Sequence, residues 1–550
     1  MSLRKLKGNI LSLPTLALCG ILLIAFFLRF TALGENPAGL FRDEASTGYD
    51  AYSIMLTGRD QYGTLLPLFS RSFGDYNESF YRFLAIPSIY FFGLTEFAVR
   101  FPAAVIGLLT IVVFYFLGKV LFNERIALVQ ALILAISPWH IQFSRVAFRA
   151  ILFPFFFCLG LLLFFKGLEK KKFLILSAVA FSLSIYTYSS ARIFIPLFLA
   201  VLSVIFFKDL VKNRIYSLKA LMIFLTVFAV LGMYWISPEG MARANATVGS
   251  NAVQWVKNYL SYFSPDFLFF NGDPNLRHSI RGFGQLYVFE IFSIAAGLMV
   301  LLFMTLKRKR GDLRFRQTMI LLFAGIALYP IPAALTEPNH ALRAVIGSVL
   351  FPLISGYGIY WAAAFFRKKS IKMFAVLGIL LILFAGSFNY VKHYFLEYPY
   401  YSWYHWDYGW KQAVAFSKQK NYRDIFVSNH FFLPHCFILF YAKYPPEKYQ
   451  KAPVSHLTQK NLKIYKFSMP PYHILPLEDI DPSRYPGSLI ITFPKQAKYL
   501  REQRSLEEVG VVKTPGGKVL INLLEKKAGN NVECREVKNR LFFLPFHKEP

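Results

Sequence analysis

Long unbroken apolar runs are the feature that most limits the structures this chain can form. Hydrophobic residues make up 55% of its 550 residues, and the runs lack the regular polar interruptions of amphipathic elements. About twenty consecutive apolar residues suffice for one helical crossing of a bilayer. We therefore predict a polytopic α-helical membrane protein with about 11 transmembrane helices. The candidate spans are residues 11–32, 98–120, 124–139, 148–166, 172–189, 192–207, 218–236, 286–306, 317–335, 344–365 and 372–390.

The charge pattern predicts the orientation of these spans. A net charge of +30 would favour a nucleic-acid partner in a water-soluble chain, but here much of the lysine and arginine falls in clusters between apolar runs. Such clusters mark the cytoplasmic side of a membrane. We expect a plasma (inner) membrane protein without a nucleic-acid partner. The clusters on the side of the basic N-terminus are Lys119 with Arg125, Lys166 with 170–172, Lys208 with Lys212 and Arg214, 307–310, and 367–369.

The N-terminal segment is expected to remain as the first span. Arg4, Lys5 and Lys7 precede an apolar run, as in a signal peptide, but the run from Leu11 to Phe30 is longer than a usual apolar core. No small-residue cleavage motif follows it. With this span retained and an odd number of crossings, the N-terminus is cytoplasmic and everything after residue 391 is extracytoplasmic.

Two domains are predicted from the change in composition near residue 391. Residues 1–391 form the transmembrane domain, with a first external loop at 34–97 and another at 237–285. Residues 392–550 contain shorter apolar runs in which strand and helix patterns alternate. They are expected to form an extracytoplasmic α/β domain. Its cysteines, Cys436 and Cys534, lack metal-ligand spacing, and nothing in the sequence decides whether they pair.

An acidic pair, Asp43 and Glu44, follows the first span at the membrane surface. A carboxylate next to hydrocarbon is costly unless it is paired, hydrated or used, which makes the pair a functional candidate. The alternative is helix capping: Asp43 would accept backbone N–H bonds from a helix over about 44–55, and the helix dipole would favour Glu44. Both interpretations stay open, since a cap also fixes a catalytic side chain in place.

Further polar candidates lie on the same predicted face. No nucleotide-binding fingerprint, HExxH motif or nucleophile elbow is present. Arg149, Arg192 and Arg343 each begin an apolar run on the external side, where the planar guanidinium suits a lipid phosphate. For any single arginine, snorkelling to headgroups is the favoured explanation of the position. The other candidate substrate-binding residues are His140, Tyr188, Arg277, His278 and His340.

Several segments resemble the C-type membrane glycosyltransferases, in particular bacterial proteins of glycosyltransferase family 39, which are similar to protein O-mannosyltransferases, and the lipid A aminoarabinose transferases. The acidic pair lies in Arg42-Asp43-Glu44-Ala45, directly after the first span. The other segments that carry the resemblance are Tyr49-Asp50-Ala51, Gly58-Arg59-Asp60-Gln61-Tyr62-Gly63, Phe73-Gly74-Asp75-Tyr76, Ser137-Pro138-Trp139-His140, Tyr186 to Arg192, Asp273 to His278, Pro330-Ile331-Pro332-Ala333 and His340-Ala341-Leu342-Arg343.

The resemblance implies a sugar, mannose or similar, carried on a polyprenyl phosphate and transferred with inversion to an extracytoplasmic hydroxyl. It implies that Asp43 is the essential acidic residue, supported by Glu44. A divalent cation such as Mg²⁺ or Mn²⁺ is an open cofactor, with Asp43 as the candidate ligand. In the aminoarabinose branch a lysine near the loop end meets the carrier phosphate, whereas this chain reads Asp75 to Ser79. Arginines would then contact the carrier phosphate in place of that lysine.

The acceptor stays open, as a protein, lipid or glycan. Two other functions also fit the pattern: a flippase or transporter for a lipid-linked sugar, because charged residues near spans mark substrate pathways, and a non-catalytic scaffold for envelope assembly. The large external loop and the α/β domain favour the enzyme.

Overall fold

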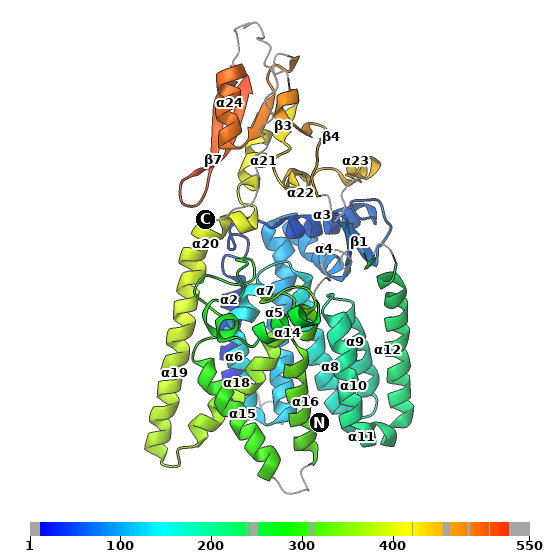
Figure 1. Cartoon of the computed structure of the whole chain (residues 1–550), viewed down its shortest axis with the longest axis vertical. Coiled ribbons are helices and arrows are strands. Elements are labelled where there is room, and N and C mark those ends of the chain that lie inside the picture. Colours follow the sequence, from blue (N-terminus) through cyan, green and yellow to red (C-terminus); the bar gives the residue numbers. More distant parts are fainter. Residues whose placement is uncertain are drawn as a thin grey trace.

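The computed structural model describes residues 12–237, 240–241, 251–307, 313–420, 422–454, 462–480, 484–504 and 506–526. A bundle of long helices forms the main body, and an α/β domain lies at one end of it (Figure 1). Cys534 and residues 308–310 of one predicted basic cluster lie outside the described ranges.

In the described ranges, a helix overlaps each of the predicted spans. These helices are α2 (Leu13–Phe30), α5 (Glu96–Leu121), α6 (Glu124–Ile136), α8 (Leu152–Glu169), α9 (Phe173–Ile185), α10 (Ala191–Ile205), α12 (Arg214–Trp235), α15 (Glu290–Lys307), α16 (Leu313–Leu328), α18 (Gly347–Ala364) and α19 (Lys369–Lys392).

Length and composition identify six segments among these helices that could each cross a membrane unaided. A seventh arises if α6 and α7 (Pro138–Ser144), which meet at a 59° bend, are taken as one span. The multi-pass helical fold predicted from the sequence is therefore confirmed, while the number of crossings and their direction stay predictions. The short helix α11 (Phe207–Lys212), with its lysines, lies at the end of the bundle opposite the α/β domain (Figure 1).

Small residues allow the helices to pack closely. A methyl group added to Gly358 of α18 would lie 1.9 Å from the carbonyl oxygen of Ser293 in α15. One added to Gly118 of α5 would lie 2.3 Å from Oε1 of Gln130 in α6. Close backbone approach through small residues is the usual packing mode of membrane helices. Replacing either glycine with a larger residue would force the helix pair apart.

The first loop between spans is a folded layer under the α/β domain. It contains α3 (Arg42–Thr57), which covers the helix expected over about 44–55, and α4 (Phe80–Phe92). Between them, β1 (Phe69–Ser72) and β2 (Asp75–Glu78) pair antiparallel, with Ser72 opposite Asp75. The tight turn is made by Phe73 and Gly74, both with positive φ. This hairpin is not among the elements predicted from the sequence.

The later loops are mostly irregular. The short elements around them are η1 (Arg149–Ile151), α14 (Ala252–Ser261), the π-helical turn η2 (Asp266–Phe270), α17 (Ile331–Ala334), η3 (His393–Glu397), α20 (Tyr398–Ser402) and η4 (Trp403–Trp406). The loops 271–289 and 335–346 bring polar side chains back toward α3.

The C-terminal domain is the predicted α/β unit. Its sheet has the order β4-β5-β3-β6-β8-β7, in which β3 pairs parallel with β5 and β6, and β7 pairs antiparallel with β8. The strands are β3 (Ile425–Ser428), β4 (Phe467–Met469), β5 (Tyr472–Leu475), β6 (Leu489–Thr492), β7 (Leu506–Lys513) and β8 (Val519–Lys526). The helices are α21 (Trp410–Gln419), α22 (Pro434–Ala442), α23 (Pro446–Lys451) and α24 (Pro494–Arg504), with a short η5 (Leu477–Asp479).

Candidate functional site

A cavity of about 470 Å³ lies where the first loop, the segment before α8 and the loops 271–289 and 335–346 meet. Its walls combine carboxylates, guanidinium groups, histidines and aromatic rings. The polar and aromatic residues that line it are Phe41, Asp43, Thr47, Ser72, Asn77, Glu78, Tyr81, Arg82, Phe148, Arg149, Tyr188, Asp273, Asn275, Arg277, His278, Glu337, His340 and Arg343.

Asp43 presents its carboxylate to this cavity from the first turn of α3. Its side chain is exposed, and among the described residues it takes part in no hydrogen bond or ion pair. The helix therefore starts without using Asp43 as a cap, because the capping carboxylate belongs to Glu44, which accepts the backbone N–H of Phe41 at 3.1 Å. Asp43 is left available for a ligand.

Glu44 points the other way and is fully buried. Its oxygens accept from Nε and Nη2 of Arg100 at 2.9 and 3.0 Å, and from the backbone N–H of Ala147 at 2.8 Å. Arg100 also donates to the carbonyls of Leu33, Pro37 and Gly39. Glu44 thus ties α3 to α5 and does not line the cavity. These contacts are structural, and the catalytic support expected of Glu44 from the sequence stays a prediction.

Glu78 joins two of the predicted phosphate ligands. Its buried carboxylate pairs with Nε of Arg149 at 2.8 Å and with Nη2 of Arg192. Burial opposes ionisation of Glu78, but Arg192 and Arg149 outweigh it and lower its pKa to about 2. Arg149 and Tyr188 both line the cavity, and the guanidinium lies 5.5 Å from the ring centroid. Arg192 pairs with Glu78 but does not line the cavity. The structure therefore gives it no direct contact with a ligand in the cavity.

Arg277 lines the cavity over the ring of Phe41, with 3.9 Å between the guanidinium carbon and the ring centroid. Its Nε donates to Oδ1 of Asn275 at 3.1 Å. Within the described ranges no carboxylate forms a salt bridge with it. Burial lowers the pKa of Arg277, and the nearby charge of Asp43 opposes this effect. An anionic ligand would relieve the cost of burying this cation.

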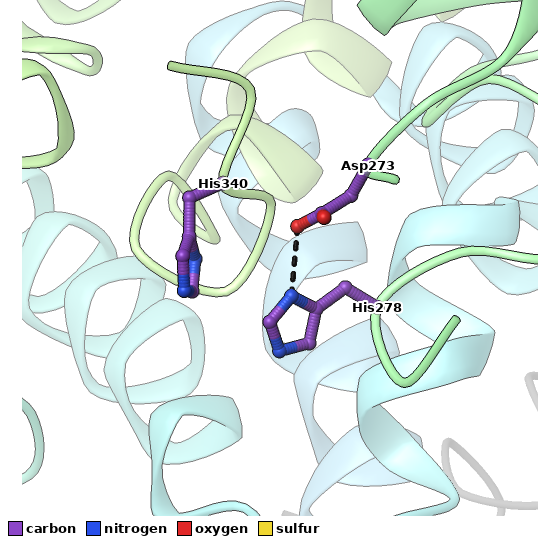
Figure 2. Close-up of side chains that lie close together, drawn as sticks. All are labelled: Asp273, His278 and His340. Carbon is purple, nitrogen blue, oxygen red and sulfur yellow. Dashed lines mark hydrogen bonds and ion pairs between the residues drawn. The ribbon is translucent and has the colours of Figure 1, made fainter. Parts of the chain in front are cut away.

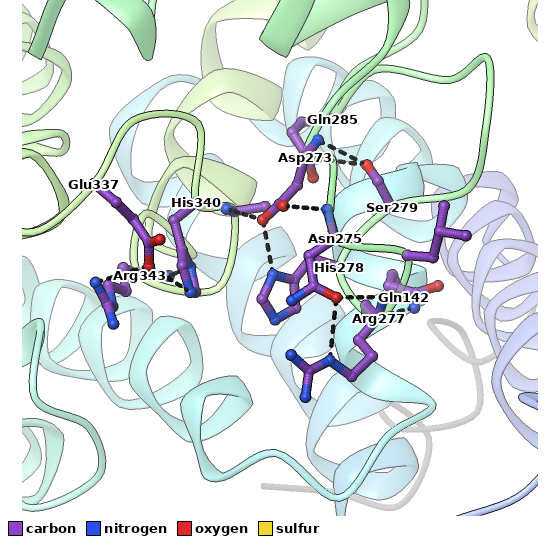
Figure 3. Close-up of polar contacts among 12 residues, drawn as sticks. Gln142, Asp273, Asn275, Arg277, His278, Ser279, Gln285, Glu337, His340 and Arg343 are labelled. Atoms are coloured by element: carbon purple, nitrogen blue, oxygen red, sulfur yellow. Dashed lines mark hydrogen bonds and ion pairs between the residues drawn. The ribbon is translucent and has the colours of Figure 1, made fainter. Parts of the chain in front are cut away.

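Asp273, His278 and His340 converge on one side of the cavity (Figure 2). Oδ2 of Asp273 pairs with Nδ1 of His278 at 2.7 Å and accepts the backbone N–H of Ala341 at 2.7 Å. The His278 and His340 ring centroids are 4.7 Å apart. Glu337 reaches His340 at 3.4 Å and Arg343 at 3.0 Å (Figure 3). Each histidine is thus held by a carboxylate of its own loop, and the two loops are far apart in sequence.

The same three residues could hold a metal ion. One potential ligand atom from each of Asp273, His278 and His340 lies within 4.8 Å of the others. Two imidazoles and a carboxylate suit Zn²⁺ or Mn²⁺, whereas Mg²⁺ prefers oxygen ligands alone. Asp43, the ligand candidate from the sequence, is not in this group. Ion binding would require the hydrogen bond between Asp273 and His278 to give way.

His140 is placed away from the cavity. It is fully buried in α7, where Nδ1 lies 2.8 Å from Nη2 of Arg29. The 59° bend between α6 and α7 turns this segment into the bundle. His140 thus forms a buried hydrogen bond with Arg29 and does not line the cavity, and the substrate contact expected for it stays a prediction.

The cavity also contains residues that the sequence did not mark as ligands, among them Asn77, Arg82 and Asn275. Arg82 pairs with the buried Asp50 at 2.7 Å. Arg82 lies in the first turn of α4, and its Nη1 donates to the backbone carbonyl of Glu78, the last residue of β2, at 3.3 Å. Its nearness in sequence to the acidic Glu78 is the signal that could have found it.

Comparisons with known proteins agree with this architecture. Residues 80–235 match the family model described as dolichyl-phosphate-mannose-protein mannosyltransferase. No curated protein sequence matches the chain.

Solved structures give a wider match. The chain is similar to ArnT from Cupriavidus metallidurans bound to undecaprenyl phosphate, at 12% identity and a TM-score of 0.54, covering 92% of this chain and 97% of that one. The apo state of ArnT matches at 13% identity with a TM-score of 0.56, covering 93% of this chain and 98% of that one. The apo oligosaccharyltransferase of Archaeoglobus fulgidus matches at 15% identity with a TM-score of 0.51, covering 83% of this chain and 62% of that one.

The two ArnT matches cover nearly the whole length of both chains, and identities of 12% and 13% carry the fold but no substrate. The protein is therefore a multi-pass membrane protein with the fold of the C-type membrane glycosyltransferases.

Proposed function

We propose that the protein is a glycosyltransferase that moves a sugar from a polyprenyl-phosphate donor to an acceptor hydroxyl at the extracytoplasmic face. The observation that carries the proposal is the arrangement of one cavity: the unpaired carboxylate of Asp43 faces a wall that contains Arg149, Arg277 and Arg343. The family model over residues 80–235 and the fold shared with ArnT, solved with undecaprenyl phosphate, support this donor class.

The arginines are suited to the donor phosphate. Arg277 is a largely buried cation with no salt bridge in the described ranges, so it can accept a phosphate without giving up an existing partner. Arg149 and Arg343 are each about one-fifth exposed or less and are held by Glu78 and Glu337. Guanidinium groups fixed in this way stabilise the charge that grows on a departing phosphate.

Asp43 is suited to activate the acceptor hydroxyl. It would take the proton from the acceptor hydroxyl as that oxygen attacks the anomeric carbon. The bond from the anomeric carbon to the phosphate oxygen breaks, and polyprenyl phosphate leaves with the bonding electron pair. A single displacement with the base and the leaving group on opposite sides inverts the anomeric carbon. Mannose, or a sugar of similar size, is the substrate suggested by the family model.

Tyr188 and Phe41 provide aromatic surfaces in the same cavity.

A divalent ion held by Asp273, His278 and His340 would add Lewis-acid charge beside the phosphate. In its absence Asp273 fixes His278 through Nδ1, which leaves Nε2 as the ring nitrogen free to meet a sugar hydroxyl or phosphate oxygen.

The test is release of polyprenyl phosphate from a panel of labelled polyprenyl-phosphate sugars in proteoliposomes of the full chain, with candidate protein, lipid and glycan acceptors. A transferase releases the carrier phosphate and yields a product of inverted anomeric configuration. A flippase would instead move the intact donor across the bilayer without release, and a scaffold would do neither. Either of these results across the panel would overturn the proposal.

A further inference from the structure

The helix that carries Asp43 is enclosed between the two domains. A methyl group added to Gly48, in the middle of α3, would come within 2.6 Å of Val99 in α5 and 2.7 Å of Phe440 in α22. The hydroxyl of Tyr49 donates to the carbonyl of Tyr444 at 2.8 Å. The C-terminal domain therefore packs directly on the back of α3, along the side away from the bundle.

The far end of α3 is fixed by the same domain. Nε2 of Gln450, in α23, lies 3.0 Å from the hydroxyls of Ser53 and Thr57 and from the carbonyl of Asp60. These contacts lie at the end of the helix remote from Asp43. They hold the helix but do not approach the cavity lining.

The near end of α3 is held by Asp407, which follows η4. Oδ2 of Asp407 accepts the backbone N–H of Arg42 at 3.3 Å and Nε of its side chain at 3.1 Å. Oδ1 accepts from Nη2 of Arg42 at 2.9 Å. The first N–H groups of a helix have no partner inside the helix. A carboxylate 365 residues along the chain thus serves as a cap for the turn that contains Asp43.

The backbone around Asp407 is shaped for this contact. Asp407 has φ of 45° and Gly409 has φ of 105°, so the chain turns sharply between η4 and α21. A methyl group on Gly39 would lie 2.5 Å from the carbonyl oxygen of Trp406, which shows how closely this turn is pressed against the segment before α3. On the outer side, the ring of Phe432 covers the Arg42 guanidinium at 4.3 Å. Phe432 follows β3 in the C-terminal domain, so the contacts around Arg42 include residues of both domains.

We propose that Asp407 is a positioning residue for Asp43: it fixes the first turn of α3 through Arg42 and thereby sets where the Asp43 carboxylate lies in the cavity. The inference rests on the proposed function. Asp43 follows Arg42 directly and makes no side-chain hydrogen bond or ion pair within the described ranges, so its location depends on the backbone of this turn. The C-terminal domain is then part of the catalytic machinery, in addition to any role in binding an acceptor.

The test compares full-length Asp407→Ala, Asp407→Asn and Gln450→Ala in proteoliposomes. Misplacing a reacting group by about 1 Å costs about 100-fold in rate, so Asp407→Ala should lower kcat by about that factor. The donor's KM should change by less than about threefold, because the salt bridge of Asp407 is with Arg42, which does not line the cavity. Asparagine is a good cap without a charge, so Asp407→Asn should recover part of kcat. Gln450→Ala, at the other end of α3, should leave kcat near that of the wild type.

Hydrogen exchange of a peptide covering residues 41–47 supplies a readout that does not depend on turnover. Loss of the cap should make its amides exchange about fivefold faster in Asp407→Ala, with peptides from α22 and β3 unchanged. Unchanged exchange, or faster exchange with normal kcat, would overturn the proposal. If α22 and β3 also loosen in Asp407→Ala, the same comparison is made with Asp407→Asn. If the wild type transfers no sugar, the proposed function fails, and exchange alone decides whether Asp407 holds α3.

Discussion

Replacing Glu78 with glutamine should lower the free energy of unfolding at neutral pH, and lower it by about half as much at pH 3. Glu78 is a buried carboxylate shared by Arg149 and Arg192, and glutamine keeps its shape while removing its charge. The two arginines would then face each other without a neutralising partner. Because Arg149 lines the cavity, the change also loosens one wall of the candidate site.

The size of the effect follows from the pKa of Glu78, which falls from 4.5 to about 2 in the folded protein. A group whose pKa is lowered by folding stabilises the protein above its unfolded pKa and loses this contribution as the pH falls through the folded pKa. The difference corresponds to about 3 kcal/mol at pH 7 and to about half of that at pH 3. The destabilisation caused by Glu78→Gln should shrink by about half between these two pH values.

The assay is denaturant unfolding in detergent micelles, followed by tryptophan fluorescence at pH 7, 5, 4 and 3. Glu337→Gln is the matched control, since Glu337 also pairs with an arginine of the cavity but is 49% exposed. Exposed pairs contribute at most about 1 kcal/mol, so this control should show a small effect at every pH. A Glu78→Gln penalty that is independent of pH, or no larger than that of the control, would refute the reasoning.

Three further predictions follow from the same contacts. Arg277→Ala should raise the donor's KM about tenfold or more in turnover assays, because a charged hydrogen bond to phosphate is lost, whereas Arg192→Ala should mainly lower stability; equal KM effects would contradict this. Glu44→Gln should lower the free energy of unfolding by about 3–5 kcal/mol, because it leaves Arg100 buried without its partner, and a neutral result would contradict the buried pair. Zn²⁺ added to metal-free protein should raise the melting temperature, and His278→Ala should abolish the rise; a rise kept in that variant would place the ion elsewhere.

The positions of the long apolar helices could be predicted from the sequence because they depend on a simple physical property. Apolar runs must be helical in a bilayer, so their positions give the helices directly. In the C-terminal domain the buried strands β3 and β6 were likewise visible as short apolar runs. The hairpin β1–β2 was not, because its sequences FSRS and DYNE are polar and short. Its pairing comes from the turn and from contacts with distant residues.

The candidate site could be predicted only in part. The sequence marked Asp43 and Glu44 together, but adjacent residues on a helix point about 100° apart, and only the packing of α3 decides which one faces the cavity. His140 looked external because it ends an apolar run, while the bend at α7 buries it. The meeting of Asp273 with His340 joins two loops whose relative position no local pattern encodes.

The central claim is that Asp43 is the base in a cavity whose arginines hold the carrier phosphate. The most direct measurement is release of labelled polyprenyl phosphate by the wild type and by Asp43→Asn, alongside binding of polyprenyl phosphate to both. Asp266→Asn serves as the control, because Asp266 is an exposed carboxylate outside the cavity lining. The account predicts a loss of about 100-fold to 10,000-fold in rate for Asp43→Asn with binding retained, and normal release in the control. Near-normal release by a folded Asp43→Asn variant would contradict it.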